Sequence, residues 1–245
     1  MSHPLPQAVL LDLDDTILDD SGNVTQFWLE ACFAHRAEMG GLDPAALHET
    51  IERTRGWFWA DPERHRAGRL ELTAARCEIV RMSLTNIRAD VPGLAAKIAD
   101  TYGVLRDRGT QPLAGAVDTI RWLRERRCRL ALLTNGNGVA QRAKVDRFGL
   151  AALFDLILIE GELGFGKPDP RIYQQALNEM AVEPSDAWMI GDNLEWDVAQ
   201  PQQLGIFSIW VDVRGEGLPT GSRVRPDRTV RRLSELREPR TSTAS

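Results

Sequence analysis

The stretch AVLLDLDDTILDD, residues 8–20, places several carboxylates directly after an apolar run. Clustered carboxylates raise one another's pKa and destabilise a fold unless positive charge lies among them. Asp12 and Asp14 are two residues apart, so their side chains lie on the same side of an extended strand. The pair is therefore suited to a metal or phosphate site, although the same residues could simply solvate the end of a strand.

Later segments offer chemically complementary groups. Thr134 ends the run RLALLT and Asn135 follows it, and their hydroxyl, amide and backbone donors suit phosphoryl oxygens. Lys167, in GKPDP, would supply an ammonium group that offsets carboxylate and phosphate charge. Asp192 follows the run AWMIG, and Asp197 lies five residues further on. The Asp192 carboxylate suits a metal ligand. Asp197 could hold a metal-bound water, could pair with Lys167, or could be an acidic residue favoured by a helix dipole.

Short apolar runs separated by helix-length segments must position these groups. We predict strands over residues 8–14, 129–134, 154–160, 187–192 and 207–212. Each run is apolar on both faces, which indicates an α/β fold with a Rossmann-like parallel sheet covered by helices on both sides. Ligands of such sheets bind beyond the carboxyl ends of the strands, where the polar residues described above follow.

Residues 20–109 break this alternation. They contain helical patterns and no convincing strand, and a connection of this length far exceeds an ordinary crossover. We therefore predict an inserted all-helical module. Within it, Trp57, Phe58 and Trp59 are consecutive, so on a helix at least one of them must face outward. The surrounding residues 53–69 carry a local charge of +3, from five arginines set against Asp61 and Glu63.

Composition excludes some broad classes. The net charge of −5 argues against a nucleic-acid binder, and no apolar run approaches the roughly 20 residues that span a bilayer. The N-terminus lacks a signal-peptide pattern, and the number and spacing of the cysteines fit a reducing cytoplasm. The three cysteines form no CxxC pair, which argues against a zinc site or a disulfide framework.

The segments DLDDT, LLTNG, GKPDPRIY and MIGDNLEWD occur in this order, each at or after a predicted strand end. Together they resemble the four motifs of the haloacid dehalogenase superfamily of hydrolases, and the chain is similar to its helical-cap phosphatases. The resemblance implies a catalytic core formed by residues 1–19 and 110–236 and a cap formed by residues 20–109. Residues 237–245 are predicted to be a disordered tail.

The resemblance also implies an activity, which is Mg²⁺-dependent hydrolysis of a small phosphomonoester metabolite through an aspartyl-phosphate. Asp12 matches the family's nucleophile and Asp14 its general acid and base. Thr134, Asn135 and Lys167 match the groups that bind the phosphoryl group, with Thr134 and Lys167 also counted as catalytic. The implied metal ligands are Asp12, Asp14, Asp192 and Asp197, and the cap candidates for substrate binding are Arg55, Arg64 and Arg69.

Alternative functions stay open at this stage. A phosphomutase of the same superfamily would share these motifs. A haloacid dehalogenase would need no metal and would lack the second aspartate, so Asp14 and Asp192 count against it. A non-catalytic module that binds a phosphorylated ligand would not need Asp12 as a nucleophile. We expect a small-molecule partner, no nucleic acid, no membrane, and a monomer or homodimer.

Overall fold

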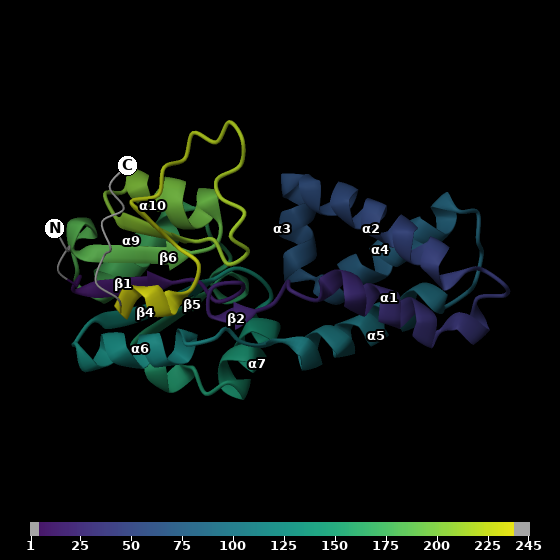
Figure 1. The fold of residues 1–245 in the computed structure, drawn as a ribbon, viewed down its shortest axis with the longest axis horizontal. Coiled ribbons are helices and arrows are strands. Elements are labelled where there is room, and N and C mark those ends of the chain that lie inside the picture. Colours follow the sequence, from purple (N-terminus) through teal and green to yellow (C-terminus); the bar gives the residue numbers. More distant parts are fainter. Residues whose placement is uncertain (1–4, 238–245) are drawn as a thin grey trace. The chain divides into compact units, whose positions relative to one another are not determined.

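The computed structural model describes residues 5–237 of the chain (Figure 1). The chain divides into two compact units, which we call the sheet unit (Met1–Asp19 and Gln111–Ser245) and the helical unit (Asp20–Thr110). Of the predicted disordered tail, residues 238–245 lie outside the described residues, and Arg237 ends the 3₁₀ helix Leu233–Arg237. No helix among the described residues is long and apolar enough to cross a bilayer.

The sheet unit is built on six parallel strands in the order β5-β4-β1-β6-β7-β8, which confirms the predicted α/β fold. The strands are β1 (Ala8–Leu11), β4 (Arg129–Thr134), β5 (Leu156–Ile159), β6 (Ala187–Gly191), β7 (Phe207–Val211) and β8 (Arg228–Val230). The first five lie within the predicted runs. Strand β8 was not predicted, because its three residues include a charged one and form no apolar run.

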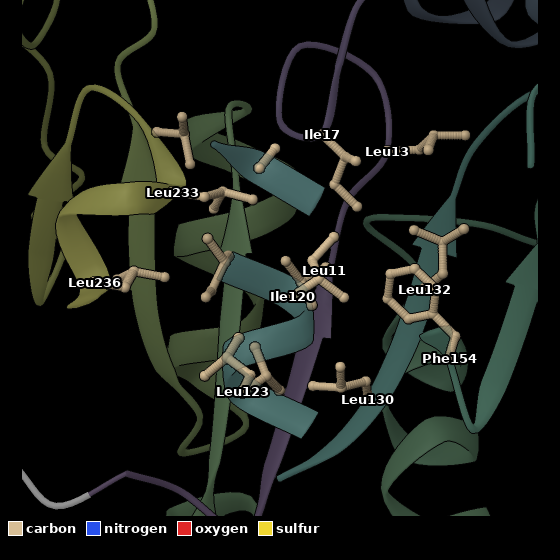
Figure 2. Packing of buried hydrophobic residues seen from close by; sticks show 14 of the residues in the cluster. Leu11, Leu13, Ile17, Ile120, Leu123, Leu130, Leu132, Phe154, Leu233 and Leu236 are labelled. Carbon is tan, nitrogen blue, oxygen red and sulfur yellow. The ribbon is translucent and has the colours of Figure 1, made fainter. Parts of the chain in front are cut away.

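Helices cover both faces of this sheet (Figure 1). On one side lie α6 (Ala116–Glu125) and α7 (Gly138–Arg147), and on the other α9 (Pro170–Glu179) and α10 (Gln200–Gln203). Val9 and Leu11 point into the cluster that contains Ile120 and Leu123 of α6, part of which Figure 2 shows. Leu10 lies instead in the cluster on the opposite face, with residues of α9. Both faces of β1 are thus buried, which explains its continuous apolar run. The short helix α8 spans Glu160–Leu163, directly after β5.

Strand β1 lies at the switch point of the sheet. The chain places β4 and β5 on one side of β1, and then β6, β7 and β8 on the other side. Strand β1 pairs with β4 on one side and β6 on the other, and the Asp12 amide donates to the carbonyl oxygen of Ile190 at 2.9 Å. Ligands of doubly wound sheets bind at such a point. The chain leaves and re-enters the sheet unit through an antiparallel pair, β2 (Leu18–Asp19) with β3 (Gln111–Pro112).

The helical unit contains α1 (Val24–Ala34), α2 (Pro44–Ala60), α3 (Pro62–Leu70), α4 (Leu72–Asn86) and α5 (Leu94–Gly109), with a 3₁₀ helix at Arg36–Glu38. Side chains of Asp43 and Asp61 cap α2 and α3, and a proline follows each cap. This is a favourable helix start, because the cap accepts from a free amide and proline lacks one. Trp57 is 51% exposed while Phe58 is buried, as the aromatic spacing predicted.

Candidate active site

Three carboxylates meet at the carboxyl edge of the sheet. Asp12 follows β1 and Asp192 follows the neighbouring strand β6, while Asp197 lies in the π-helix Leu194–Ala199. One ligand oxygen of each lies within 4.8 Å of the others. Asp197 is fully buried and Asp12 nearly so. Sheet topology therefore brings Asp12 next to Asp192, which is far away in the sequence, and Asp197 follows Asp192 by five residues.

Lys167 lies among these carboxylates. Its Nζ atom donates to Oδ1 of Asp12 at 2.7 Å and to Oδ1 of Asp197 at 2.6 Å, and the side chain is only 1% exposed. Burial alone would lower the pKa of Lys167, but the two carboxylates outweigh burial and raise the pKa. The lysine thus stays charged and partly neutralises the acidic cluster.

One ammonium group does not balance three carboxylates. Burial, with the charges of neighbouring carboxylates, raises the pKa of Asp12 to about 7 and that of Asp192 to about 9. The cluster therefore needs further positive charge, either as protons or as a cation. A set of closely spaced carboxylate oxygens fits a hard divalent cation such as Mg²⁺. Asp12, Asp192 and Asp197 are the residues that could hold it.

Local backbone geometry fixes Asp197. Its Oδ2 atom accepts from the amide of Asn193 at 3.0 Å, and the Asn193 side chain caps the π-helix through the amides of Glu195 and Trp196. A Cβ atom at Gly191 would lie 2.2 Å from the carboxyl group of Asp197. Glycine is required at this position because any side chain would occupy the space that the carboxylate fills.

Asp14 is not a member of the carboxylate cluster. Its Oδ2 atom accepts from Nε2 of Gln141 at 3.0 Å, and its Oδ1 atom accepts from Nζ of Lys144 at 2.7 Å. Nε2 of Gln141 also lies 2.5 Å from the hydroxyl oxygen of Thr134. Two residues of α7 therefore fix the Asp14 carboxylate next to Thr134 at the end of β4.

The Asn135 side chain holds the loop that carries Lys167. Its Nδ2 atom donates to the carbonyl oxygen of Lys167 at 2.6 Å, and its Oδ1 atom accepts from the Lys167 amide at 2.8 Å. A Cβ atom at Gly166 would lie 2.5 Å from that Oδ1 atom, so glycine permits the close approach. The side-chain amide is thus engaged with the protein, and contact of Asn135 with a phosphoryl group stays a prediction.

Sequence reasoning missed Gln141 and Lys144. They lie three residues apart on α7, and residues at this spacing share one face of a helix. A polar pair on the helix that directly follows the TNG segment was the available signal. Neither residue directly follows an apolar run, so the strand-end pattern that locates the other site residues does not point to this pair.

The cap candidates lie in the helical unit, where each has a local partner. Arg55 pairs with Glu52 at 2.6 Å. Arg64 donates to the carbonyl oxygen of Trp57 at 3.0 Å, and its guanidinium lies 3.8 Å from the centre of that ring. Nη1 of Arg69 lies 3.0 Å from Nδ1 of His65. Their role in substrate binding stays a prediction.

Comparison with known proteins gives one similarity over nearly the whole chain and another over less than half of it. The chain is 35% identical over 250 residues to a phosphoserine phosphatase from Thermus thermophilus, and the match covers 94% of this chain and 97% of that protein. It is 35% identical over 109 residues to the N-acylneuraminate-9-phosphatase of Rattus norvegicus, over 44% of each chain.

Among solved structures, a 2-haloacid dehalogenase from Pseudomonas syringae pv. Tomato has a TM-score of 0.61 and 28% identity, covering 96% of this chain and 97% of that one. The magnesium-bound HAD-hydrolase YfnB from Bacillus subtilis has a TM-score of 0.72, covering 95% and 97% of the two chains. At 21% identity, the second similarity shows the fold alone. A family model described as haloacid dehalogenase-like hydrolase matches residues 6–205, and with these similarities it shows that the chain belongs to that family of hydrolases.

Proposed function

We propose that this hydrolase is a phosphatase that cleaves a small phosphomonoester, with Asp12 as the nucleophile and Mg²⁺ as the cofactor. The observation that carries the proposal is the position of Asp12, which shares Lys167 with Asp197 and lies beside Asp192. A carboxylate that is hydrogen-bonded to Lys167 and could also bind a cation is suited to attack an anionic phosphoryl group, whose charge would otherwise repel it.

In the first step, a carboxylate oxygen of Asp12 attacks phosphorus and the bond from phosphorus to the substrate oxygen breaks. Lys167 binds Oδ1 of Asp12, and no hydrogen bond to Oδ2 is found among the described residues, which favours Oδ2 as the attacking atom. Asp14 gives its proton to the departing alkoxide, so that an alcohol leaves and an aspartyl-phosphate forms.

In the second step, Asp14 takes a proton from water, and the water oxygen attacks phosphorus. The bond between phosphorus and the Asp12 oxygen breaks, which releases inorganic phosphate and restores the carboxylate. Gln141 and Lys144 support this assignment of Asp14, because they hold both of its oxygens in one orientation. The Thr134 hydroxyl would donate to a phosphoryl oxygen in both steps.

Mg²⁺ would be held by Asp12, Asp192 and Asp197, with the backbone carbonyl of Asp14 as a further predicted ligand. When bound, it would neutralise charge on the phosphoryl group and on the carboxylates that surround it. The cluster contains three carboxylates and one ammonium group, so it carries excess negative charge that a divalent cation would neutralise. This excess supports the proposed metal.

The proposal also assigns a role to each of the two units and a class of substrate. The sheet unit would be the catalytic core and the helical unit the cap, with Arg55, Arg64 and Arg69 as candidates for substrate contacts. Relatives named as phosphatases of phosphoserine and N-acylneuraminate 9-phosphate make a small phosphorylated metabolite the expected substrate class. We expect the protein to act in the cytoplasm without a nucleic-acid partner.

A second hydrolytic activity must be tested, because one solved relative is a 2-haloacid dehalogenase. The purified chain should release phosphate from a panel of phosphorylated metabolites with Mg²⁺, lose this activity in excess chelator, and release no halide from 2-chloropropionate. Asp12→Asn should abolish turnover and the trapping of acid-stable phosphate on the protein. Phosphate release by Asp12→Asn at the original rate, or halide release alone, would show that the proposal is wrong.

A further inference from the structure

The turn of helix that carries Asp197 has an unusual hydrogen-bond register. Residues Leu194–Ala199 form a π-helix, and the amide of Gln200 donates to the carbonyl oxygen of Glu195, five residues earlier. An α-helix would use the carbonyl four residues earlier, so this turn is one residue wider. Such π-turns are rare in proteins as a whole and occur frequently at functional sites. The register therefore requires a physical cause.

A proline interrupts the backbone ladder of this turn. The next hydrogen bond in the π register would run from the amide of residue 201 to the carbonyl oxygen of Trp196, but Pro201 has no N–H group. Pro201 is buried, and so is Asp197, which directly follows Trp196. Buried backbone polar groups nearly always have hydrogen-bond partners, so another element has to supply the donor for this carbonyl.

Tyr173 of α9 supplies a donor. Its hydroxyl group donates to the carbonyl oxygen of Trp196, and the residue is fully buried. Tyr173 belongs to an apolar cluster with Ala176 and Met189, where a phenylalanine ring would fill the same space. The hydroxyl group therefore adds this hydrogen bond to the packing, at the place where Pro201 lacks its N–H group.

The position of the Tyr173 hydroxyl group favours the π register over the α register. In the α register, the carbonyl group that loses its donor to Pro201 would be that of Asp197, four residues earlier. In the π register it is the carbonyl group of Trp196, which Tyr173 reaches. The hydrogen bond from Tyr173 therefore compensates for the proline in the π register alone.

The segment that carries Tyr173 also holds the side chain of Asp197. Lys167 lies six residues before Tyr173, and its Nζ atom donates to Oδ1 of Asp197 at 2.6 Å. The two contacts thus reach consecutive residues, Trp196 through its backbone and Asp197 through its carboxylate. Together they connect the register of the turn to the direction of the carboxylate.

The register matters because Asp197 fits closely among its neighbours. Its Oδ2 atom accepts from the amide of Asn193 at 3.0 Å, and a Cβ atom at Gly191 would lie 2.2 Å from its carboxyl group. A shift of one residue in register turns a helix by about 100°. Such a rotation would carry the carboxylate away from Asn193 and from Lys167.

We propose that Tyr173 is a positioning residue of the candidate active site. Its hydroxyl group replaces the N–H group that Pro201 lacks, and it holds the π-turn in the register that directs Asp197 toward Lys167. Tyr173 acts through the backbone of Trp196. The inference rests on the proposed function only where it concerns Mg²⁺ and turnover, because Asp197 is one of the proposed ligands.

Hydrogen exchange measured by NMR in chelator tests this role without metal or turnover. In Tyr173→Phe, the amides of Ala199 and Gln200 should exchange about tenfold faster, because their turn loses a hydrogen bond to α9. Tyr102→Phe is the matched control. It removes the hydroxyl group of the only other tyrosine in the sequence, which lies on α5 of the helical unit, and should leave the exchange of these two amides unchanged.

A second substitution restores the missing donor from the other side. In Tyr173→Phe combined with Pro201→Ala, the amide of residue 201 can donate to the carbonyl oxygen of Trp196. The hydrogen bonds of Asp197 with Lys167 and Asn193 favour the π register in that variant. Exchange in the double variant should therefore return close to the wild-type rate, and Pro201→Ala alone should match the wild type. A role of Tyr173 in packing alone would give no such rescue.

Metal affinity then shows what the position of Asp197 contributes. Substitution of groups that orient metal ligands typically weakens metal binding about 10- to 100-fold. We expect Tyr173→Phe to bind Mg²⁺ about tenfold more weakly by calorimetry, at the low end of that range, and the double variant to bind it like the wild type. In phosphatase assays, Tyr173→Phe should need more Mg²⁺ for half-maximal rate, while kcat at saturating Mg²⁺ stays close to wild type.

Three results would overturn the proposal. They are unchanged exchange of Ala199 and Gln200 in Tyr173→Phe, no return toward the wild-type rate when Pro201→Ala is added, and equal Mg²⁺ affinity in Tyr173→Phe and a wild type that binds the metal. A wild type that neither binds Mg²⁺ nor releases phosphate would contradict the proposed function instead. The exchange measurements would then still decide whether Tyr173 holds the turn.

Discussion

The Nζ atom of Lys144 lies 2.7 Å from Oδ1 of Asp14, although the two residues are 130 positions apart in sequence. Gln141, one helical turn before Lys144, donates to the other oxygen of the same carboxylate. Helix α7 thus fixes the orientation of the group to which we assign proton transfer. A general acid must lie within hydrogen-bond reach of the leaving oxygen, so its orientation bears directly on the rate.

Lys144→Met should lower kcat about ten- to a hundredfold with little change in KM, a part of the 10²–10⁴-fold that general acid–base catalysis supplies. The loss should be larger for alkyl phosphates than for aryl phosphates, whose leaving groups need less protonation. Arg142→Met is the matched control, because Arg142 lies on the same helix and pairs with Glu162. Equal losses for alkyl and aryl substrates, or a loss in the control, would argue for a general structural effect.

Lys167→Met should destabilise the sheet unit, because it leaves Asp12 and Asp197 buried without their shared partner. Removing one partner of a buried ion pair typically costs about 3–5 kcal/mol. Faster hydrogen exchange in β1 and β6 would report the loss, and added Mg²⁺ should reverse part of it. Lys97→Met is the control, since Lys97 makes an exposed pair with Glu38, and exposed pairs contribute little to stability. Unchanged exchange in Lys167→Met would contradict this account.

Metal affinity should depend on pH. The raised pKa values of Asp12, about 7, and Asp192, about 9, mean that these carboxyls hold protons in the metal-free fold when the unfolded chain has lost them. The metal-free protein should therefore lose stability as the pH rises from about 4 to about 9. Mg²⁺ must displace those protons, so its affinity should rise from pH 6 to pH 9. Calorimetry in buffers of different ionisation enthalpy would measure the protons released, and pH-independent binding would contradict the prediction.

Much of the sheet could be predicted because buried parallel strands are continuous apolar runs, and β1, β4, β5, β6 and β7 all fall within such runs. The polar residues after β1 and β6 could be placed at one edge for the same reason, since parallel strands end together. Strand β8 could not be found, because its pairing with β7 depends on tertiary contacts that three residues do not encode.

The detailed contacts of the site were harder to predict than its location. Asn135 could be placed at the end of β4, but its hydrogen bonds to the backbone of Lys167 depend on the folded loop. Charge counting pointed to arginines near Trp57, and the structure gives Arg55, Arg64 and Arg69 each a local partner that the count could not show. Composition records how many charges a segment has, and only packing shows which of them have partners.

Gly191→Ala should impair the site without removing any of its functional groups. The added Cβ atom would lie 2.2 Å from the carboxyl group of Asp197, which is fully buried and cannot move into solvent. Overpacking of this kind typically costs about 1–3 kcal/mol, and relief of the clash would pull Asp197 away from Lys167. Activity should fall together with Mg²⁺ affinity, because one of the three carboxylates leaves the cluster.

Gly56→Ala is the matched control for that substitution. Gly56 lies within α2, and a Cβ atom there would have no neighbour within 4 Å. Alanine favours a helix over glycine by about 1 kcal/mol, so this variant should keep its activity and melt at or above the wild-type temperature. The comparison requires a melting curve, a Mg²⁺ titration and one rate measurement for each variant. Wild-type Mg²⁺ affinity in Gly191→Ala would show that Asp197 does not contribute to the metal site. The role of Asp197 would then be to hold Lys167 through their hydrogen bond.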